Sequence, residues 1–236
     1  MNKEYSSFLK EEAGLTLTEI LVTLFLIGLI FVSANFSGLG EGDHLKEAAS
    51  TVERAMRYAS SEAILKNRIL RLKINLNSAP QEYVIEEGPS SSFTLPSSLY
   101  EENNEDLSLK DQEEKSKKKS EHDKQFQLIT DFNNGPKKFH PSIRLVGAGT
   151  VSTKKIISSG EVSIYVFPSG ERDNALLIFA NNKEIISVDI PAFKNKFNLT
   201  SLAVRSSQEN SFDSMEALLE RQDELAEQLF EEWMSK

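Results

Sequence analysis

The sequence predicts an α+β protein: an N-terminal membrane-spanning helix, an amphipathic helix packed on an antiparallel β-sheet, a disordered insertion and a C-terminal helix. Three patterns support this prediction. An apolar, charge-free run lies near the N-terminus, a stretch with helical spacing of apolar residues follows it, and several strand-like segments come later. Because the strands follow the helix instead of alternating with helices, they are expected to pair in an antiparallel sheet.

Changes in composition divide the chain into five segments. They are an N-terminal segment at 1–14, a membrane helix at 15–36, an amphipathic helix at 43–67, a sheet domain at 68–205 with the insertion at 101–124, and a tail at 206–236. A chain of 236 residues therefore has room for one moderate globular domain beside the membrane helix and the tail.

The apolar run from Leu15 to Ala34 has about the 20 residues that a helix needs to cross a bilayer. Lys3 and Lys10 precede the run, and the next basic residue is Lys46. Because basic residues gather on the cytoplasmic side of membrane helices, we expect the N-terminus in the cytoplasm and the bulk of the chain outside it.

The segment 43–67 has apolar residues at the three- and four-residue spacing of one helix face. They are Leu45, Ala48, Ala49, Val52, Ala55, Met56, Ala59, Ala63 and Ile64. Alanine dominates this face, so a sheet is expected to pack closely against it. Three glycines within 36–42 predict a bend before the helix, since each glycine costs a helix about 1 kcal/mol relative to alanine.

Strand-like segments fill much of 68–205. Leu70, Leu72 and Ile74 alternate with polar or charged residues, which is the period of a half-buried strand. Further strands are expected at 83–85, 143–146, 162–167, 176–179, 185–188 and 197–204. Asn181 and Asn182 predict a tight hairpin turn between two of these strands.

The insertion at 101–124 has nine acidic and six basic residues but only two apolar ones, Leu107 and Leu109. A segment of this composition buries too little apolar surface to offset the entropy lost on ordering. The sequence therefore predicts a disordered loop inside the sheet domain.

The tail at 206–236 carries nine acidic residues against two basic ones, and its apolar residues form one helical stripe opposite the acids. Three interpretations stay open. The stripe folds back on the chain's own sheet, it docks in a basic groove of a partner, or the tail is disordered. Docking would use Leu218, Leu225, Leu229, Phe230 and Trp233.

Composition argues against several other functions. The net charge of −9 disfavours binding to the phosphate backbone of nucleic acids, and the absence of cysteine excludes disulfides and thiolate chemistry. His44, His122 and His140 have no metal-ligand spacing, and His122 falls in the insertion, so exposed, inert histidines are expected. We therefore expect no catalytic, metal or cofactor residues. An anchored periplasmic enzyme or binding domain is the less favoured alternative.

A short pattern opens the membrane helix: a small residue, then an apolar one, then a carboxylate. In the segment from Gly14 to Glu19, the acid follows the glycine by five positions, and Leu15 stands directly after the glycine. This pattern resembles the processing site of type IV pilins and pseudopilins. The resemblance implies a pilin-like fold, cleavage after Gly14 by a prepilin peptidase, and methylation of the new amino group at Leu15.

A carboxylate inside a spanning helix costs about 2.5–3.5 kcal/mol at mid-helix and less near an end, so Glu19 needs a partner. The partner we expect is the amino group of Leu15 in a neighbouring subunit, which would make Glu19 an assembly residue. Two alternatives stay open here: an ordinary secretory signal cleaved after Ala34, and an uncleaved anchor with Glu19 at the membrane interface.

Two further segments narrow the resemblance. The strand and turn at 164–171, which include Phe167-Pro168-Ser169-Gly170, and the helix segment 57–67 are similar to those of the H-type minor pseudopilins of type II secretion. This similarity implies a structural subunit of a short periplasmic pseudopilus, held in the inner membrane by one span. Its partners would be other pseudopilins and the inner-membrane secretion machinery. A minor pilin of a type IV pilus, used in motility or DNA uptake, is the alternative.

Overall fold

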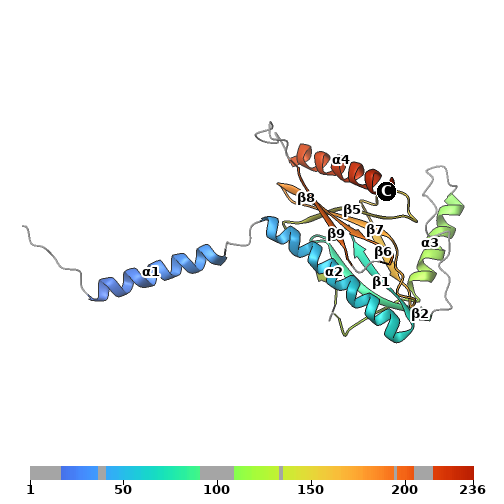
Figure 1. Cartoon of the computed structure of the whole chain (residues 1–236), viewed down its shortest axis with the longest axis horizontal. Coiled ribbons are helices and arrows are strands. Elements are labelled where there is room, and N and C mark those ends of the chain that lie inside the picture. Colours follow the sequence, from blue (N-terminus) through green and yellow to red (C-terminus); the bar gives the residue numbers. More distant parts are fainter. Residues whose placement is uncertain (1–16, 37–40, 91–108, 133–134, 194–195, 205–214) are drawn as a thin grey trace, which may run out of the picture. The chain divides into compact units, whose positions relative to one another are not determined.

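The computed structural model describes residues 17–36, 41–90, 109–132, 135–193, 196–204 and 215–236 (Figure 1). The chain separates into two compact units, one up to Gly40 and one from Glu41 onward. The first unit contains helix α1 (Leu17–Phe36). The second, called here the globular unit, contains all the other elements.

The globular unit combines three helices and nine strands among the described residues. The helices are α2 (Glu41–Lys66), α3 (Leu109–Asp123) and α4 (Met215–Met234). The strands are β1 (Arg68–Asn75), β2 (Glu82–Ser90), β3 (Gln127–Leu128), β4 (Lys137–Lys138), β5 (Arg144–Thr150), β6 (Glu161–Val166), β7 (Ala175–Ala180), β8 (Glu184–Ile190) and β9 (Asn198–Ala203). The predicted mixture of helices and antiparallel strands is confirmed.

The strands form two sheets instead of the single sheet that the sequence predicts. The first sheet has the order β3-β2-β1-β6, with β4 also paired to β2, and the second has the order β5-β7-β8-β9. Every pair of named strands is antiparallel. The hairpin predicted at Asn181 is confirmed, because β7 pairs with β8 and the Asn181 side chain accepts hydrogen bonds from the backbone N–H groups of Lys183 and Glu184.

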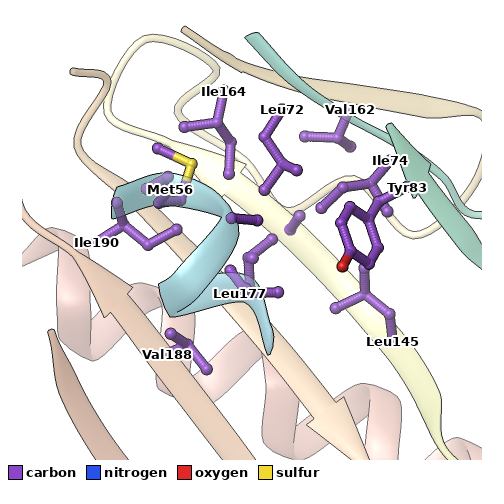
Figure 2. Packing of buried hydrophobic residues seen from close by; sticks show 14 of the residues in the cluster. Met56, Leu72, Ile74, Tyr83, Leu145, Val162, Ile164, Leu177, Val188 and Ile190 are labelled. Atoms are coloured by element: carbon purple, nitrogen blue, oxygen red, sulfur yellow. The ribbon is translucent and has the colours of Figure 1, made fainter. Parts of the chain in front are cut away.

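The alanine-rich face of α2 packs on both sheets and forms the main core. The helix contacts β1 and β6 of the first sheet and β7 and β8 of the second. Figure 2 shows Met56 of α2 in the same packed cluster as Leu72 of the first sheet and Leu177 of the second. Small side chains such as Ala59, which is fully buried, let the helix backbone approach the strands closely.

Helix α2 begins at Glu41, so Gly42 lies inside the helix and not in the predicted bend. Residues 37–40, which carry the other two glycines of that bend, lie outside the described residues. The buried face that follows compensates for one unfavourable glycine in the first turn.

The predicted disorder at 101–124 is wrong for its second half, because Leu109–Asp123 forms helix α3. The prediction considered only apolar burial, whereas α3 is held by polar contacts from its last turn to the first sheet. Pairs one turn apart, such as Lys118 with Glu114 at 3.8 Å, add smaller support. Residues 101–108 lie outside the described residues.

Candidate assembly site

Helix α1 exposes large apolar side chains on all sides of its first three turns, Leu17 to Ile27. The large apolar residues between Leu17 and Ile27 are 47–79% exposed. An amphipathic helix would bury one stripe on its own domain, whereas a helix that is apolar all round is normally covered by lipid or by other helices. The surface of α1 is therefore suited to packing against neighbours outside its own unit.

Within the described part of the chain, none of the helices combines the length and the apolar character that a membrane crossing requires. Gly14 and Leu15 lie outside the described residues, so cleavage after Gly14 and methylation of Leu15 stay predictions.

Glu19 lies in the first turn of α1 and is the only charged residue of that helix. Its side chain is exposed, and the hydroxyl of Thr23 donates a hydrogen bond to its backbone carbonyl. The positive end of the helix dipole lies at the first turn, so a carboxylate is better placed there than at mid-helix. The structure thus places the predicted assembly residue on a surface that is otherwise uncharged and mostly apolar between Leu17 and Ile27.

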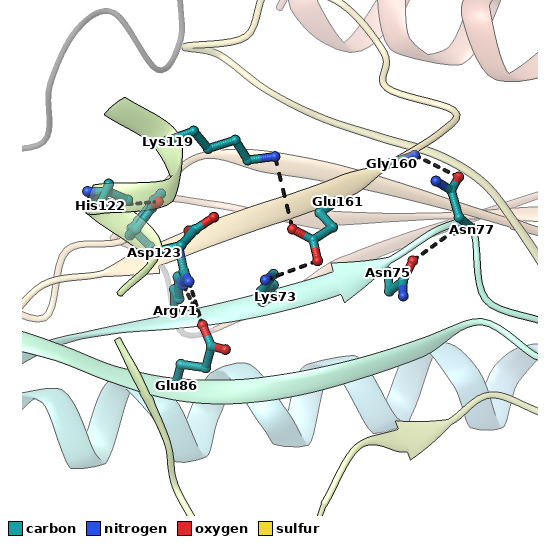
Figure 3. A network of polar contacts seen from close by, with 11 residues as sticks. Arg71, Lys73, Asn75, Asn77, Glu86, Lys119, His122, Asp123, Gly160 and Glu161 are labelled. Carbon is teal, nitrogen blue, oxygen red and sulfur yellow. Dashed lines mark hydrogen bonds and ion pairs between the residues drawn. The ribbon is translucent and has the colours of Figure 1, made fainter. Parts of the chain in front are cut away.

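Among the described residues of the globular unit, the most buried charge is that of Arg71 on β1, whose side chain is 2% exposed. Its guanidinium lies 2.6 Å from Glu86 on β2 and 2.5 Å from Asp123 at the end of α3 (Figure 3). The ring of Phe126 covers the guanidinium, with its centroid 4.1 Å from the Arg71 Cζ atom. These contacts bind the last turn of α3 to two strands of the first sheet. We call Arg71, Glu86, Asp123, His122 and Tyr165 the polar anchor.

His122 completes the polar anchor and corrects the sequence prediction that it is exposed and inert. The residue is buried, and its Nε2 atom lies 2.9 Å from the hydroxyl of Tyr165 on β6. Burial lowers the pKa of His122, and the positive charge of Arg71 lowers it further. Composition alone gave no signal for this contact, since 43 residues separate the two partners.

A second histidine contact was also missed from the sequence. His44 in the first turn of α2 stacks on His140, with ring centroids 3.8 Å apart and planes 6° apart. Within the described residues, no group of three His, Asp or Glu residues is arranged to hold a metal ion.

Asp173 lies beside β6, where its carboxylate accepts a hydrogen bond of 2.9 Å from the backbone N–H of Tyr165. Burial raises its pKa to about 6, although that hydrogen bond acts in the opposite direction. The folded state therefore binds a proton that the unfolded state releases between about pH 4 and pH 6. Stability from this group rises as the pH falls through 6 and is lost as the pH rises again.

Asp173→Asn is expected to remove this pH dependence while keeping the side-chain acceptor for Tyr165. At pH 7.5 the variant should be more stable than the wild type by about 2 kcal/mol, and the difference should shrink towards pH 4. Urea unfolding of both proteins at pH 7.5, 6 and 5 measures this difference in the free energy of unfolding. Parallel pH profiles for the two proteins would show that Asp173 does not titrate as described.

The docking interpretation of the tail needs correction. Helix α4 packs against β5 and β7, on the face of the second sheet. Leu218, Leu225 and Phe230 are buried there, and Leu229 and Trp233 are partly buried in the same cluster. The apolar stripe is therefore covered by the chain's own sheet and is not available to a partner, which is the fold-back interpretation.

Close approach and polar contacts fix α4 in this place. A Cβ atom on Gly149 of β5 would lie 2.4 Å from the ring of Phe230, so the strand needs glycine at this position. Gln222 donates a hydrogen bond of 3.0 Å to the carbonyl of Asn181, and the Trp233 ring N–H donates one of 2.9 Å to Asp189.

Fold and candidate site together define a class: an α+β globular unit that follows an exposed apolar helix with one carboxylate in its first turn. No protein-family model matches the sequence, and no curated protein matches it. Two solved structures of the minor pseudopilin EpsH from the type II secretion system of Vibrio cholerae are similar. The first has 14% identity and a TM-score of 0.40, over 68% of this chain and 98% of that chain. The second has 12% identity and a TM-score of 0.40, over 66% of this chain and 93% of that chain.

Proposed function

We propose that this chain is a minor pseudopilin, a structural subunit of a short periplasmic filament that drives type II protein secretion. In this proposal the apolar run from Leu15 to Ala34 inserts the chain in the inner membrane, and a prepilin peptidase cleaves it after Gly14. The new N-terminus is methylated at Leu15, and the globular unit lies in the periplasm. The chain does no chemistry of its own; it packs against other pseudopilins and the inner-membrane secretion machinery.

One observation carries the proposal: a single carboxylate, five positions after Gly14, in a mostly apolar helix whose large apolar side chains from Leu17 to Ile27 are exposed. Burying a carboxylate among apolar helices is costly, so packing of Glu19 in the assembled state calls for a cation beside it. Cleavage after Gly14 would create that cation, since the new amino group has a reference pKa near 8 and is mostly protonated at neutral pH. Each subunit would then pair its Glu19 with the Leu15 amino group of a neighbour, which sets the stagger between helices.

The choice of the H-type class rests on the turn after β6. Gly170 has φ of 85°, a conformation that favours glycine, and its N–H donates to the carbonyl of Phe167 at 2.9 Å. The Phe-Pro-Ser-Gly segment therefore forms a tight turn with a fixed glycine requirement. Genes for secretion components beside the gene of this chain would support the pseudopilus, and genes for pilus components would favour a type IV pilus.

Gly14→Val is expected to leave the full-length precursor in the membrane, because the peptidase needs a small residue before the cleaved bond. Electrophoresis and intact mass of the membrane fraction measure the outcome. Gly28→Val, a change of the same size inside α1, is the matched control and should be processed normally. Normal cleavage of Gly14→Val would contradict the proposed processing site.

Glu19→Gln is expected to be inserted and cleaved but to assemble at least tenfold less into filaments. Removing the charge eases insertion, whereas the Leu15 amino group of a neighbour loses its counter-charge. Thr23→Val, one turn further along α1, is the control that should assemble normally. Cross-linking of subunits in membranes measures assembly, and wild-type levels for Glu19→Gln would contradict the role of this residue.

A further inference from the structure

The two sheets protect three of their four edges in the described part of the chain. The first sheet ends on one side in β3 and β4, which have only two residues each. On its other side, Asp173 covers β6, because its N–H donates to the Tyr165 carbonyl at 2.9 Å. In the second sheet, Ile157 exchanges two hydrogen bonds of 2.8 and 3.0 Å with Ala148 on the outer side of β5. Short strands and covering loops are the usual ways to prevent pairing with other chains.

Among the described residues, the fourth edge, β9 (Asn198–Ala203), has none of these protections. The strand pairs along its whole length with β8, and no other described segment pairs with it. It contains no charged residue and no proline, and all six residues are exposed. An uncharged, six-residue edge with free backbone groups is a template for another strand.

The strand is nevertheless held firmly at both ends. Phe197 is buried, and its ring centroid lies 5.2 Å from the Arg172 guanidinium and 5.5 Å from that of Arg57. Val204 is buried at the other end, and its N–H donates to the carbonyl of Lys183 at 2.9 Å. The edge is therefore preformed, so pairing would cost little ordering entropy.

Each face of β9 carries one exposed leucine. Helices α2 and α4 cover the two faces of the second sheet elsewhere. Leu199 is 54% exposed and lies opposite Val188, which belongs to the main core under α2. Leu202 is 40% exposed and lies opposite Ile185, which belongs to the cluster under α4. Directly opposed residues share a face, so an added strand would cover one leucine on each face.

We infer that β9 pairs antiparallel with β9 of a second copy of this chain, about a two-fold axis at Ser201. When two identical strands pair antiparallel about a two-fold axis, the axis passes through one residue, which then lies opposite its own copy. An axis between two residues would set side chains of opposite faces against each other. Centring on Ser201 sets Leu199 opposite Ala203 and Leu202 opposite Thr200 of the second copy. The strand itself brings no charge to the pair, and each Ser201 hydroxyl donates a hydrogen bond of 3.0 Å to the Glu184 carboxylate of its own copy.

The pairing is expected to be weak. One pair of six-residue strands buries much less than the roughly 1,200 Å² that stable complexes need. The contact therefore forms at high protein concentration. It involves the globular unit alone and does not depend on the proposed role of α1.

Disulfide trapping tests this pairing directly, because the chain has no cysteine of its own. Ser201→Cys would provide one thiol per chain, and thiols of two paired copies would meet at the two-fold axis. Purified full-length protein in detergent is mildly oxidised and separated without reductant. We expect at least five times more covalent dimer for Ser201→Cys than for Ser142→Cys, an exposed serine outside the strands.

A second pair of variants separates β9 pairing from association through α1. Adding Leu202→Lys to Ser201→Cys should reduce the yield of covalent dimer at least fivefold, since a lysine on an edge strand disfavours pairing with another strand. Adding Leu128→Lys, at a leucine of the same 40% exposure on β3, should leave the yield unchanged. Equal dimer for Ser201→Cys and Ser142→Cys, or no loss with Leu202→Lys, would overturn the inference.

Discussion

Replacing Arg71 by methionine is expected to lower the free energy of unfolding by about 3 kcal/mol. Methionine fills similar space, so the loss comes mainly from the charges. Removing one partner of a buried ion pair costs about 3–5 kcal/mol because the other charge stays buried. Glu86 and Asp123 are 16% and 26% exposed, so water partly solvates the carboxylates that remain, which favours the lower end of that range.

The matched control is Lys73→Met on the same strand. Lys73 pairs with Glu161 at 3.0 Å, but both side chains are more exposed than Arg71, so the expected loss is below about 1 kcal/mol. Urea unfolding monitored by circular dichroism measures both variants. Equal small losses would show that the polar anchor does not hold α3 on the sheet. By the same reasoning, deletion of 101–124 should destabilise the unit, because it removes Asp123 and His122.

Truncation before Ser211 is expected to unfold the globular unit or to lower its stability by several kcal/mol. The deletion removes α4 and exposes the apolar face of β5, β7 and β8. The single change Phe230→Ala should cost about 3–4 kcal/mol, since a buried phenylalanine leaves both lost contacts and a cavity.

Met234→Ala is the matched control for Phe230→Ala, since Met234 lies on the same helix but is exposed. Its expected loss is below about 0.5 kcal/mol. Thermal unfolding of the three variants measures the series. A truncated protein that keeps the wild-type unfolding temperature would show that α4 is not part of the core.

Local periodicity explains which elements could be predicted from sequence. The alanine-rich face of α2, the alternation in β1 and the hairpin turn at Asn181 each depend on residues close together in the chain. In each case burial follows the pattern, so the element forms where the sequence indicates it.

Long-range contacts explain what could not be predicted. Helix α3 depends on Arg71, which lies 52 residues before Asp123, and no property of 101–124 alone indicates that pair. The division into two sheets and the target of α4 depend equally on which strands become neighbours. The unprotected edge of β9 follows from strand order, so only the structure identifies it.

The candidate site shows the same division. Gly14, Leu15 and Glu19 form a linear pattern from which the sequence alone predicts a processing and assembly site, and the structure adds the helical, exposed setting of Glu19. The apolar stripe of α4, from which docking to a partner was predicted, is also a linear pattern. The chain's own second sheet covers that stripe. A linear apolar pattern indicates burial without specifying the surface that buries it.

The N-terminus of the mature protein tests the proposed function most directly. The protein is extracted from membranes of its native host, and its N-terminal peptide is identified by mass spectrometry. The proposal predicts a chain that begins at Leu15 with one added methyl group on its amino nitrogen. A chain that begins at Asn35 would identify an ordinary secretory signal, and an intact Met1 would identify an uncleaved anchor; either result would contradict the pseudopilin proposal.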